Sequence, residues 1–314
     1  MTNSGITLVT GASGFVGACL TRRLVAMNNE VHIITRKESN KWRIQDILGR
    51  IIEHNVDLTD RDGVERLISN VRPNIVYHFA AYGGHPFQTD TYEIMQTNIM
   101  GTINLVKACS KIEYDCLVNI GSSSEYGLKH CLMKETDVLE PRSDYAVSKA
   151  SATLYCLSVS QREQRPIVTL RLFSPYGNFD APTRLIPYVI LSCLQGRNPR
   201  LSSRESVRDY IFIEDVLDVC VDIVRSHNVL GQILNVGSGE QHSVEEVAQK
   251  VIELTRSNVS PLWDETRDRH DEPKVWAADI SRVKSVLNWE PKYDLQRGLR
   301  KTIEWFLENL QFYK

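Results

Sequence analysis

Two side chains in the segment YAVSK (residues 145–149) have the types and spacing needed for proton transfer. Residues four apart on a helix share one face and lie about 6 Å apart along its axis, so Tyr145 and Lys149 can serve one site. A tyrosine with a pKa of about 10 is a weak acid or base at neutral pH, but a neighbouring ammonium group favours its phenolate. Three serines at 122–124 follow an apolar run and offer hydroxyls to a substrate oxygen. Because Tyr-x-x-x-Lys also occurs by chance, a surface pair is the alternative interpretation.

A glycine-rich turn near the N-terminus has the spacing G-x-x-G-x-x-G between a strand-like run, ITLVT, and an expected helix near residues 16–27. Glycine lets the chain turn tightly, lets its backbone approach a diphosphate, and lets the helix start against the sheet. The helix N-terminus adds unpaired N–H groups and the positive end of a dipole. The turn predicts a dinucleotide site that includes Gly11, Ser13, Gly14, Phe15, Val16 and Gly17; an ordinary strand-to-helix turn is the alternative.

The end of the second expected strand bears on the choice of coenzyme. An acid there would bind the ribose 2′-hydroxyl of NAD, whereas a base would pair with the 2′-phosphate of NADP. The sequence has Thr35-Arg36-Lys37 and no acid, which favours NADP and leaves NAD as the alternative. Arg36 is otherwise a solvated loop charge. Asp57 follows the third strand and is expected either at the adenine edge or as a helix cap.

Short β-branched runs alternate with longer amphipathic segments through the first half of the chain, which predicts a parallel sheet of β-α units. The continuous apolar runs IVYHFA and CLVNIG suit strands covered on both faces. After Leu172, proline, glycine and asparagine interrupt the periodicity, although VRDYIFIEDV and QILNVG still resemble strands. We therefore expect an α/β fold with a Rossmann-type doubly wound sheet in residues 1–172. A smaller, loop-rich substrate lobe would comprise mainly residues 173–314, with some later segments returning to the first domain.

Composition limits the classes of partner. The 37 basic and 39 acidic residues nearly balance, which argues against nucleic acid or an anionic membrane as the main partner. The seven cysteines are scattered without C-x-x-C spacing, so neither a disulfide framework nor a metal site is expected. No segment has the run of about 20 apolar residues that a membrane span requires, and no signal peptide is evident. A cytoplasmic protein is the expectation.

Taken in order, the motifs resemble those of the extended short-chain dehydrogenase/reductases (the NAD-dependent epimerase/dehydratase family), specifically their nucleotide-sugar branch. They are TGASGFVG, DLTD, HFAA, TNIMGTINL, SSSEYG, YAVSK, RLFSPYG, RDYIFIEDV, NVGSGE and ADISRVKSVLNWEP. The resemblance implies that Tyr145 is the acid/base and that Lys149 lowers its pKa and holds the nicotinamide ribose. It gives the substrate-oxygen role to Ser122, with Ser123 as the second choice, and places Asn98 at a helix kink or proton relay. Leu58, Ala80 and Ala81 would also contact the cofactor.

The same resemblance points to residues for a nucleotide-diphosphate sugar. Arg208, Arg267 and Arg269 fall where such enzymes hold the diphosphate, a task suited to guanidinium forks. Ser174 replaces the asparagine of the family's R-x-F-N-x-Y-G, which puts that contact in doubt. Arg184 and His85 complete the expected substrate residues. For each arginine a solvated loop charge is the alternative, and for His85 a structural role.

The segments GSSSEYG and YAVSKA most resemble those of the reductases that complete deoxysugar synthesis. This resemblance implies reduction of a nucleotide-linked 4-keto-6-deoxyhexose by NADPH. A 4-epimerase with tightly held NAD is the alternative, and a dinucleotide sensor without catalysis is a third. Similar 4,6-dehydratases carry a carboxylate pair or a Ser-Glu pair where this chain has Ser123 and Ser124. Glu125 lies one residue too late and, in an extended segment, would point to the opposite face. The resemblance also implies a homodimer formed through the helices that begin near Asn98 and Tyr145.

Overall fold

The computed structural model describes residues 5–226, 229–264 and 274–313. The chain forms two compact units, each assembled from separate stretches of sequence. The first unit comprises Met1–Gly127, Val138–Leu172 and Leu217–Leu234. The second unit comprises Leu128–Asp137, Phe173–Val216 and Asn235–Lys314. Within the described residues, no helix is both long enough and apolar enough to cross a membrane.

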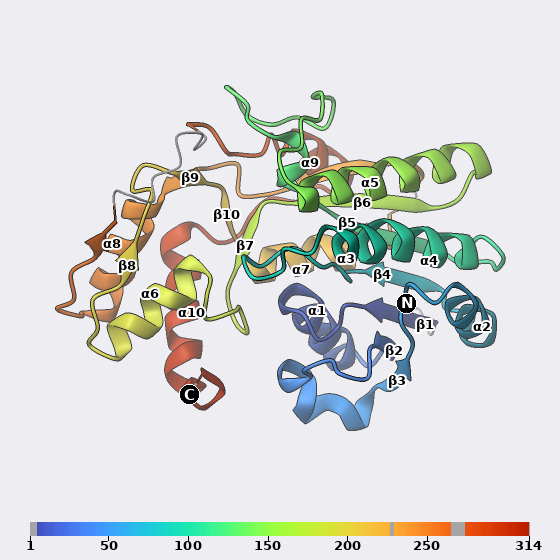
Figure 1. The fold of residues 1–314 in the computed structure, drawn as a ribbon, viewed down its shortest axis with the longest axis horizontal. Coiled ribbons are helices and arrows are strands. Elements are labelled where there is room, and N and C mark those ends of the chain that lie inside the picture. Colours follow the sequence, from blue (N-terminus) through green and yellow to red (C-terminus); the bar gives the residue numbers. More distant parts are fainter. Residues whose placement is uncertain (1–4, 227–228, 265–273, 314) are drawn as a thin grey trace. The chain divides into compact units, whose positions relative to one another are not determined.

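The first unit is built on a seven-stranded sheet with the order β11-β6-β5-β4-β1-β2-β3 (Figure 1). Its strands are β1 (Ile6–Thr10), β2 (Glu30–Thr35), β3 (Ile52–Asn55), β4 (Ile75–His78), β5 (Cys116–Ser122), β6 (Ile167–Leu172) and β11 (Ile233–Val236). The ladders that join β1 through β6 are parallel. The chain runs from β1 to one side and then returns to add β4 on the other, so the carboxyl ends of β1 and β4 flank a topological switch point. The predicted Rossmann-type fold is confirmed.

Helices cover both faces of this sheet. They are α1 (Phe15–Ala26), η1 (Trp42–Arg50), α2 (Arg61–Val71), α3 (Thr91–Met95), η2 (Gln96–Met100), α4 (Gly101–Cys109), η3 (Ser123–Tyr126), α5 (Asp144–Glu163) and α7 (Ile213–Ile223), whose first four residues belong to the second unit. Successive strand residues face opposite sides. Accordingly, Val76 packs in the core with the apolar residues of α2, α4 and α5, while the hydroxyl of Tyr77 reaches α7 and donates to the carbonyl of Cys220 at 2.9 Å. An ion pair of 2.9 Å between Arg23 and Asp218 joins α1 to α7 on that second face.

The second unit contains short strands and several helices. They are β7 (Ser174–Tyr176), α6 (Leu185–Leu194), β8 (Arg200–Leu201), β9 (Val207–Arg208), β10 (Tyr210–Phe212), β12 (His242–Ser243), α8 (Val244–Thr255), β13 (Leu262–Trp263), α9 (Ser281–Leu287), α10 (Leu295–Glu308) and η5 (Leu310–Tyr313). Its strands pair two by two. Two-stranded ladders of this length provide few hydrogen bonds between strands. Buried polar side chains therefore help to hold the loops of the second unit in place.

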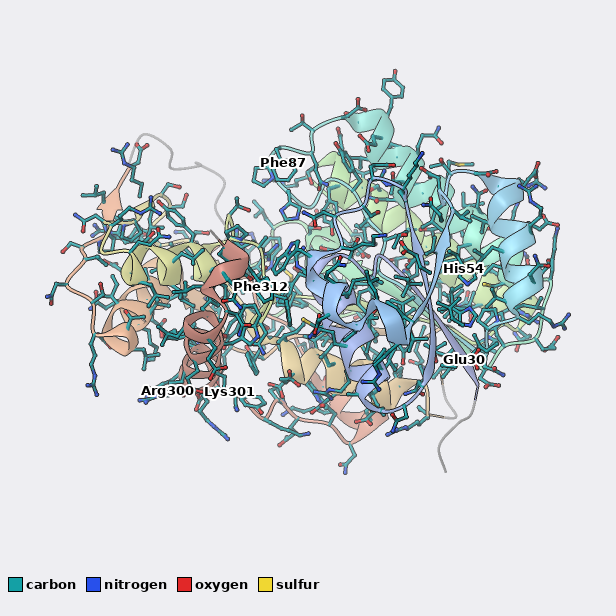
Figure 2. All side chains as sticks on the ribbon, turned by 90° about the horizontal axis from the view of Figure 1, so that it is seen from below. Glu30, His54, Phe87, Arg300, Lys301 and Phe312 are labelled. Carbon is teal, nitrogen blue, oxygen red and sulfur yellow. The ribbon has the colours of Figure 1, made fainter. Side chains whose placement is uncertain are left out.

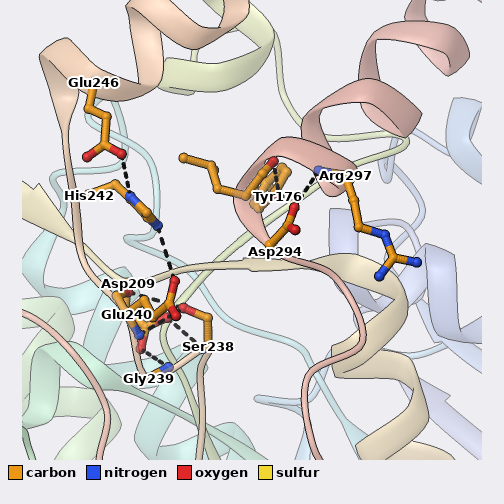
Figure 3. Close-up of polar contacts among 10 residues, drawn as sticks. Tyr176, Asp209, Ser238, Gly239, Glu240, His242, Glu246, Asp294 and Arg297 are labelled. Carbon is orange, nitrogen blue, oxygen red and sulfur yellow. Dashed lines mark hydrogen bonds and ion pairs between the residues drawn. The ribbon is translucent and has the colours of Figure 1, made fainter.

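A buried aspartate organises the loops of the second unit (Figure 3). Asp209 has no exposed surface, and its carboxylate accepts hydrogen bonds from Ser238 N and Oγ, both at 2.7 Å, from Gly239 N at 3.0 Å and from Ala278 N at 3.0 Å. One side chain therefore joins the beginning of β10 to the loop after β11 and to the segment before α9. A buried carboxylate is tolerated because backbone donors replace its water.

The expected strand in VRDYIFIEDV ends earlier than its apolar run suggests. β9 and β10 confirm its first part, but the chain becomes helical at Ile213, where α7 begins. Glu214 and Asp215 lie in the first turn, where acidic side chains complement the positive end of the helix dipole. The apolar residues that follow recur at helical spacing, so this part of the strand prediction is wrong.

Replacement of Tyr77 by phenylalanine tests the contact between β4 and α7. Cys220 is among the last four residues of α7, whose carbonyls have no partner within the helix. Loss of the hydroxyl leaves this buried carbonyl unpaired, and Tyr77→Phe is expected to lower the free energy of unfolding by about 1–3 kcal/mol, measured by urea denaturation. Tyr92→Phe is the control, because Tyr92 is 85% exposed. Equal stability of the two variants would refute the role of the Tyr77 hydroxyl.

Candidate active site

The glycine turn after β1 brings three backbone segments together. Gly14 N donates to Gly11 O at 3.0 Å and closes the turn. Gly11 has a φ of +68°, and a Cβ there would lie 2.5 Å from the backbone nitrogen of Ala80, beyond the end of β4. A Cβ on Gly17 would collide with the carbonyl of Gly11. Only glycine fits at these two positions. The first turn of α1 has neither a side-chain cap nor an acid, so its N–H groups suit an anion.

A pocket of about 310 Å³ starts at this turn. Ten of the residues expected to contact cofactor or substrate line it: Gly11, Ser13, Gly14, Arg36, Asp57, Leu58, Ala80, Ala81, His85 and Tyr145. Sequence reasoning missed further lining residues, which include Thr35, Ser39, Phe79, Tyr82, Gln88 and Thr97. Phe15, Val16, Gly17 and Lys149 lie outside the lining, the first three within the first turn of α1. The pocket thus runs from the end of β2 to the start of α5.

Arg36 lies at the β2 end of the pocket with two acidic neighbours, one close in the sequence and one from α3. Its Nε is 3.6 Å from Glu38 Oε1, and its Nη1 is 3.6 Å from Glu93 Oε1 of α3. The guanidinium side chain is 45% exposed, so water weakens both ion pairs. The backbone N–H of Arg36 donates to Ser39 Oγ at 3.0 Å, which shapes the loop beside it. Arg36 is accessible to an anionic group at this end of the pocket.

The alternative role of Asp57 as a helix cap is wrong. Asp60 caps α2 by accepting from Gly63 N at 3.0 Å. Asp57 instead accepts from the backbone and hydroxyl of Thr59, at 2.8 and 2.7 Å, in a local turn. Asp57 also lines the pocket, which leaves its predicted contact with the adenine edge as a proposal.

Tyr145 and Lys149 lie one turn apart at the start of α5, as their spacing predicts. The helix begins there because Ser143 caps it, with Oγ accepting from Ala146 N at 3.1 Å. Tyr145 lines the pocket, whereas Lys149 is only 4% exposed. Burial lowers the pKa of Lys149, and the negative charge of Glu125 opposes that shift. The pair therefore combines a phenol at the pocket with a cation behind it.

The serines after β5 lie in a helical turn and not in the expected extended segment. Ser122 caps η3: its Oγ accepts from Ser124 N at 3.2 Å and lies 2.7 Å from Ser124 Oγ. Ser123 is 7% exposed and faces inward. Glu125 is fully buried and reaches back to Ser122 N. The prediction that Glu125 follows the alternation of a strand is wrong, because the backbone turns at Ser123.

A buried hydrogen-bond network holds Tyr82 and the beginning of α5. Asn98 lies in the π-helical turn η2, accepts from Tyr82 N at 2.8 Å, and donates to Tyr82 O and Ser148 Oγ, both at 2.8 Å. Ser148 Oγ in turn donates to the carbonyl of Tyr145 at 2.8 Å. Asn98 thus positions both a pocket residue and the helix that carries the tyrosine.

His78 supports the same region from β4. Its ring nitrogens lie 2.7 Å from Thr10 Oγ1 and 2.9 Å from Thr102 Oγ1. Burial, together with the charge of Lys149, lowers the pKa of His78 to about 3, so the ring is neutral. The HFAA motif contained this histidine, but no signal in the sequence identified its threonine partners.

The loop between β4 and α3 forms another side of the pocket. Gln88 Oε1 accepts from the backbones of Gly83 and His85, at 3.1 and 3.2 Å, and fixes the bend. The rings of His85 and Phe87 stack with centroids 5.2 Å apart. Phe87 is 73% exposed and projects outward in Figure 2. The loop presents His85 at the pocket, while its apolar tip meets solvent.

The expected diphosphate and sugar residues of the second unit occupy several of its elements. Ser174 begins β7 and donates through its backbone to Asp209 O at 2.9 Å. Arg184 precedes α6, with Nε 3.7 Å from Asp180. Arg208 lies on β9, with its guanidinium over the ring of Trp276 at 5.1 Å. In the antiparallel ladder of β9 and β12, Arg208 lies opposite His242, which Figure 3 shows between Glu246 and Glu240. Arg267 and Arg269 lie outside the described residues.

No cluster of three or more histidine, cysteine, aspartate or glutamate side chains suited to a metal ion occurs among the described residues. The pocket and its surroundings offer hydroxyl, phenol, ammonium and guanidinium groups. These groups suit a dinucleotide and a polar substrate.

Known proteins share both the sequence and the fold. The low-salt glycan biosynthesis protein Agl12 of Haloferax volcanii is 27% identical over 316 residues, covering 96% of this chain and 98% of the relative. The dTDP-glucose 4,6-dehydratase of Neisseria gonorrhoeae is 27% identical, with 96% and 95% covered. The structure of the Thermus thermophilus UDP-glucose 4-epimerase in complex with NAD matches with a TM-score of 0.87 and 27% identity, covering 97% of this chain and 99% of that one.

The family assignment rests on these matches together with the geometry of the pocket. The sequence profile described as the NAD dependent epimerase/dehydratase family matches residues 7–237. That span includes the glycine turn, the serine turn and the Tyr145–Lys149 pair, which the motifs had attributed to an extended short-chain dehydrogenase/reductase. The chain belongs to the NAD dependent epimerase/dehydratase family.

Proposed function

We propose that the protein uses NADPH to reduce the 4-keto group of a 6-deoxyhexose carried by a nucleotide diphosphate. The observation that carries this proposal is the pocket itself. It joins the glycine turn and Arg36 to Tyr145, with Lys149 buried one turn behind the phenol. This arrangement suits a dinucleotide bound across the carboxyl ends of the strands.

The proposed reaction has two parts: transfer of a hydride to the sugar and donation of a proton by the protein. Bound at the glycine turn and Arg36, NADPH would supply a hydride to C4 of the sugar, which would leave oxidised NADP and an alkoxide on the former carbonyl oxygen. Tyr145 donates its phenolic proton to that oxygen, and the ammonium of Lys149 stabilises the resulting phenolate. The hydroxyl of Ser122, with Ser123 as the second choice, donates a hydrogen bond to the same oxygen. Lys149 also holds the nicotinamide ribose.

The serine turn argues against a dehydratase. Elimination of water across C5 and C6 needs an additional base and acid. Ser123 and Ser124 occupy the positions where similar dehydratases carry those groups. Glu125 is fully buried and paired with Arg171 at 2.8 Å, which removes it from this task. A reductase needs neither group.

A 4-epimerase with tightly bound NAD is the alternative. It would oxidise C4 and return the hydride to the other face of the same carbon. The 27% identical Thermus thermophilus epimerase was solved with NAD, which favours this alternative. Arg36 and Ser39 at the pocket argue for NADP, because both can bind a 2′-phosphate. A sensor without catalysis is the third candidate, and cofactor binding without turnover of any nucleotide sugar would support it.

The second unit is proposed to hold the nucleotide diphosphate. Arg208, Arg184 and Ser174 are its described candidates, with Arg267 and Arg269 beyond the described part. We further propose a cytoplasmic homodimer that pairs the helical faces around α3 and α5. Large apolar side chains with 39–85% exposure on α3, η2 and α5 support the dimer: Tyr92, Met100, Val147 and Leu154.

Tyr145→Phe tests the proposed acid directly. The variant is expected to lose nearly all turnover of keto sugar with NADPH but to retain coenzyme affinity, because the hydroxyl acts on the substrate oxygen. Lys149→Ala should weaken both turnover and coenzyme binding. Turnover is measured by NADPH consumption and affinity by coenzyme fluorescence. If Tyr145→Phe kept more than about a tenth of wild-type turnover, a barrier change under about 1.4 kcal/mol, Tyr145 would not be the acid.

Arg36→Ala tests the choice of coenzyme. Loss of a charge-assisted contact with the 2′-phosphate is expected to weaken NADPH binding by about 1.5–3 kcal/mol, with NADH nearly unaffected. Lys37→Ala, which alters the adjacent basic residue, is the comparison variant. Dissociation constants for both coenzymes are measured by fluorescence titration. An equal loss for NADPH and NADH would place specificity elsewhere, and co-purified NAD would favour the epimerase.

The absence of dehydration is a separate expectation. Incubation with coenzyme and common nucleotide-linked glucose or mannose should produce no 4-keto-6-deoxy sugar by mass spectrometry. The reason is that Ser123 and Ser124 carry hydroxyls and no carboxyl group, so neither can supply the acid or base that elimination needs. A product lighter by one water would contradict the reductase assignment, and an authentic 4,6-dehydratase serves as the positive control.

A further inference from the structure

A buried carboxylate lies behind the proposed active site without a role in the reaction as described. Glu125 has no exposed surface. Gly121 makes room for it, because a Cβ on that residue would lie 2.7 Å from Glu125 Oε1 and 3.0 Å from Arg171 Cγ. The backbone of β5 therefore passes directly over the carboxylate.

The carboxylate of Glu125 connects three elements of the first unit. Oε1 accepts from Ser122 N at 2.8 Å, at the end of β5, and from Thr153 Oγ1 at 3.1 Å on α5. Oε2 accepts from Arg171 Nε at 2.8 Å on β6. Thr153 follows Lys149 by one helical turn, so the two side chains share a face of α5. One side chain thereby links the backbone of Ser122 to the helix that carries Lys149.

Arg171 closes the other side of the cluster. It is 2% exposed, donates from Nη1 to Tyr126 Oη at 2.9 Å, and lies over the Tyr126 ring at 4.6 Å. Two buried charges of opposite sign are costly to desolvate, and an apolar pair of similar size often stabilises a protein equally well. Stability is therefore a weak reason for this pair to occur.

The groups around Lys149 indicate a role for Glu125 other than stability. Besides Tyr145 on the same helix face, the titratable groups that interact with Lys149 are Glu125, Cys156 and His78. Burial raises the pKa of Cys156 to about 12, and burial with the Lys149 charge lowers that of His78 to about 3. Both are neutral at pH 7. Among these groups, Glu125 is the one that supplies a negative charge to the buried ammonium.

We propose that Glu125 is a positioning residue that holds the Ser122 turn against the helix of Lys149 and keeps Lys149 in its ammonium form. This inference rests on the proposed roles of Ser122 and Lys149. Arg171 anchors the Glu125 carboxylate and prevents it from turning toward the pocket. No bond of the substrate is made or broken by Glu125.

The test is the pH dependence of NADPH binding in Glu125→Gln. Glutamine retains an acceptor for Ser122 N and Thr153 but removes the negative charge. Burial already lowers the pKa of Lys149, and loss of the nearby anion lowers it further. The ammonium is proposed to hold the nicotinamide ribose, so coenzyme affinity is lost as the pH rises and Lys149 loses its proton. In Glu125→Gln this loss should begin at a lower pH than in wild type. We expect the alkaline midpoint to move down by about one pH unit, measured by coenzyme fluorescence.

Three further variants separate charge from packing. Asp218→Asn is the matched control: it breaks the Arg23 ion pair on the opposite face of the same sheet and should leave the midpoint unchanged. Glu125→Asp keeps the charge and should keep the midpoint, while its shorter side chain lowers turnover. If an unpaired Arg171 prevents folding of Glu125→Gln, the double variant Glu125→Gln/Arg171→Leu removes both charges. It should still show a downward shift relative to wild type, smaller than that of Glu125→Gln because the positive charge of Arg171 is removed as well.

Coenzyme binding does not depend on the identity of the sugar. A protein that reduces no keto sugar but shows the midpoint shift would refute the proposed function and support the role of Glu125. An active enzyme whose midpoint is the same in wild type, Glu125→Gln and the double variant would support the proposed function and refute the role of Glu125. A wild-type affinity that does not fall at alkaline pH would also overturn the role of Glu125.

Discussion

The contact between the glycine turn and the end of β4 is the constraint on which the proposed active site depends. Gly11 lies so close to the backbone of Ala80 that a Cβ does not fit, and this contact places the first turn of α1 beside the loop that carries Tyr82 and His85. The parallel sheet makes the arrangement possible, because it delivers the carboxyl ends of β1, β4 and β5 to one edge. A wider turn would separate the anion-binding N–H groups from Tyr145.

Behind that edge, buried polar groups determine where the reactive side chains lie. Asn98 and Ser148 tie the start of α5 to Tyr82, and His78 braces the ends of β1 and α4 in a neutral form. Each group has its hydrogen-bond partners, so burial is tolerated and the geometry is rigid. Lys149 differs from these neutral groups because it is a cation. It is nearly inaccessible to solvent, and the negative charge of Glu125 in the serine turn opposes the effect of burial on its pKa.

The same serine turn bears on the choice among activities within the family. Where a dehydratase needs additional acid and base groups, this chain has hydroxyls and directs its carboxylate inward to Arg171. The hydroxyls of Ser123 and Ser124 and the burial of the adjacent Glu125 both belong to the helical turn η3. The acid stays close enough to influence Lys149 electrostatically but cannot reach a substrate. At the other end of the pocket, the half-exposed guanidinium of Arg36 is accessible to an anion but also has Glu38 and Glu93 nearby.

The sequence by itself determined the fold class, the glycine turn and the Tyr145–Lys149 spacing, because each is encoded by residues close together in the chain. It also predicted strands in the apolar runs IVYHFA and CLVNIG, where the structure has β4 (Ile75–His78) and β5 (Cys116–Ser122), and their continuous apolar character reflects burial on both faces. Only the tertiary structure decided the surroundings of Arg36, the partners of His78 and the fate of Glu125. Glu125 and Arg171 are 46 positions apart. The alternation of a strand turned Glu125 away from the substrate, but the local backbone is a helical turn, and the partner Arg171 comes from β6. Contacts of this kind arise when distant elements pack, and a sequence motif carries no record of which side chains then meet.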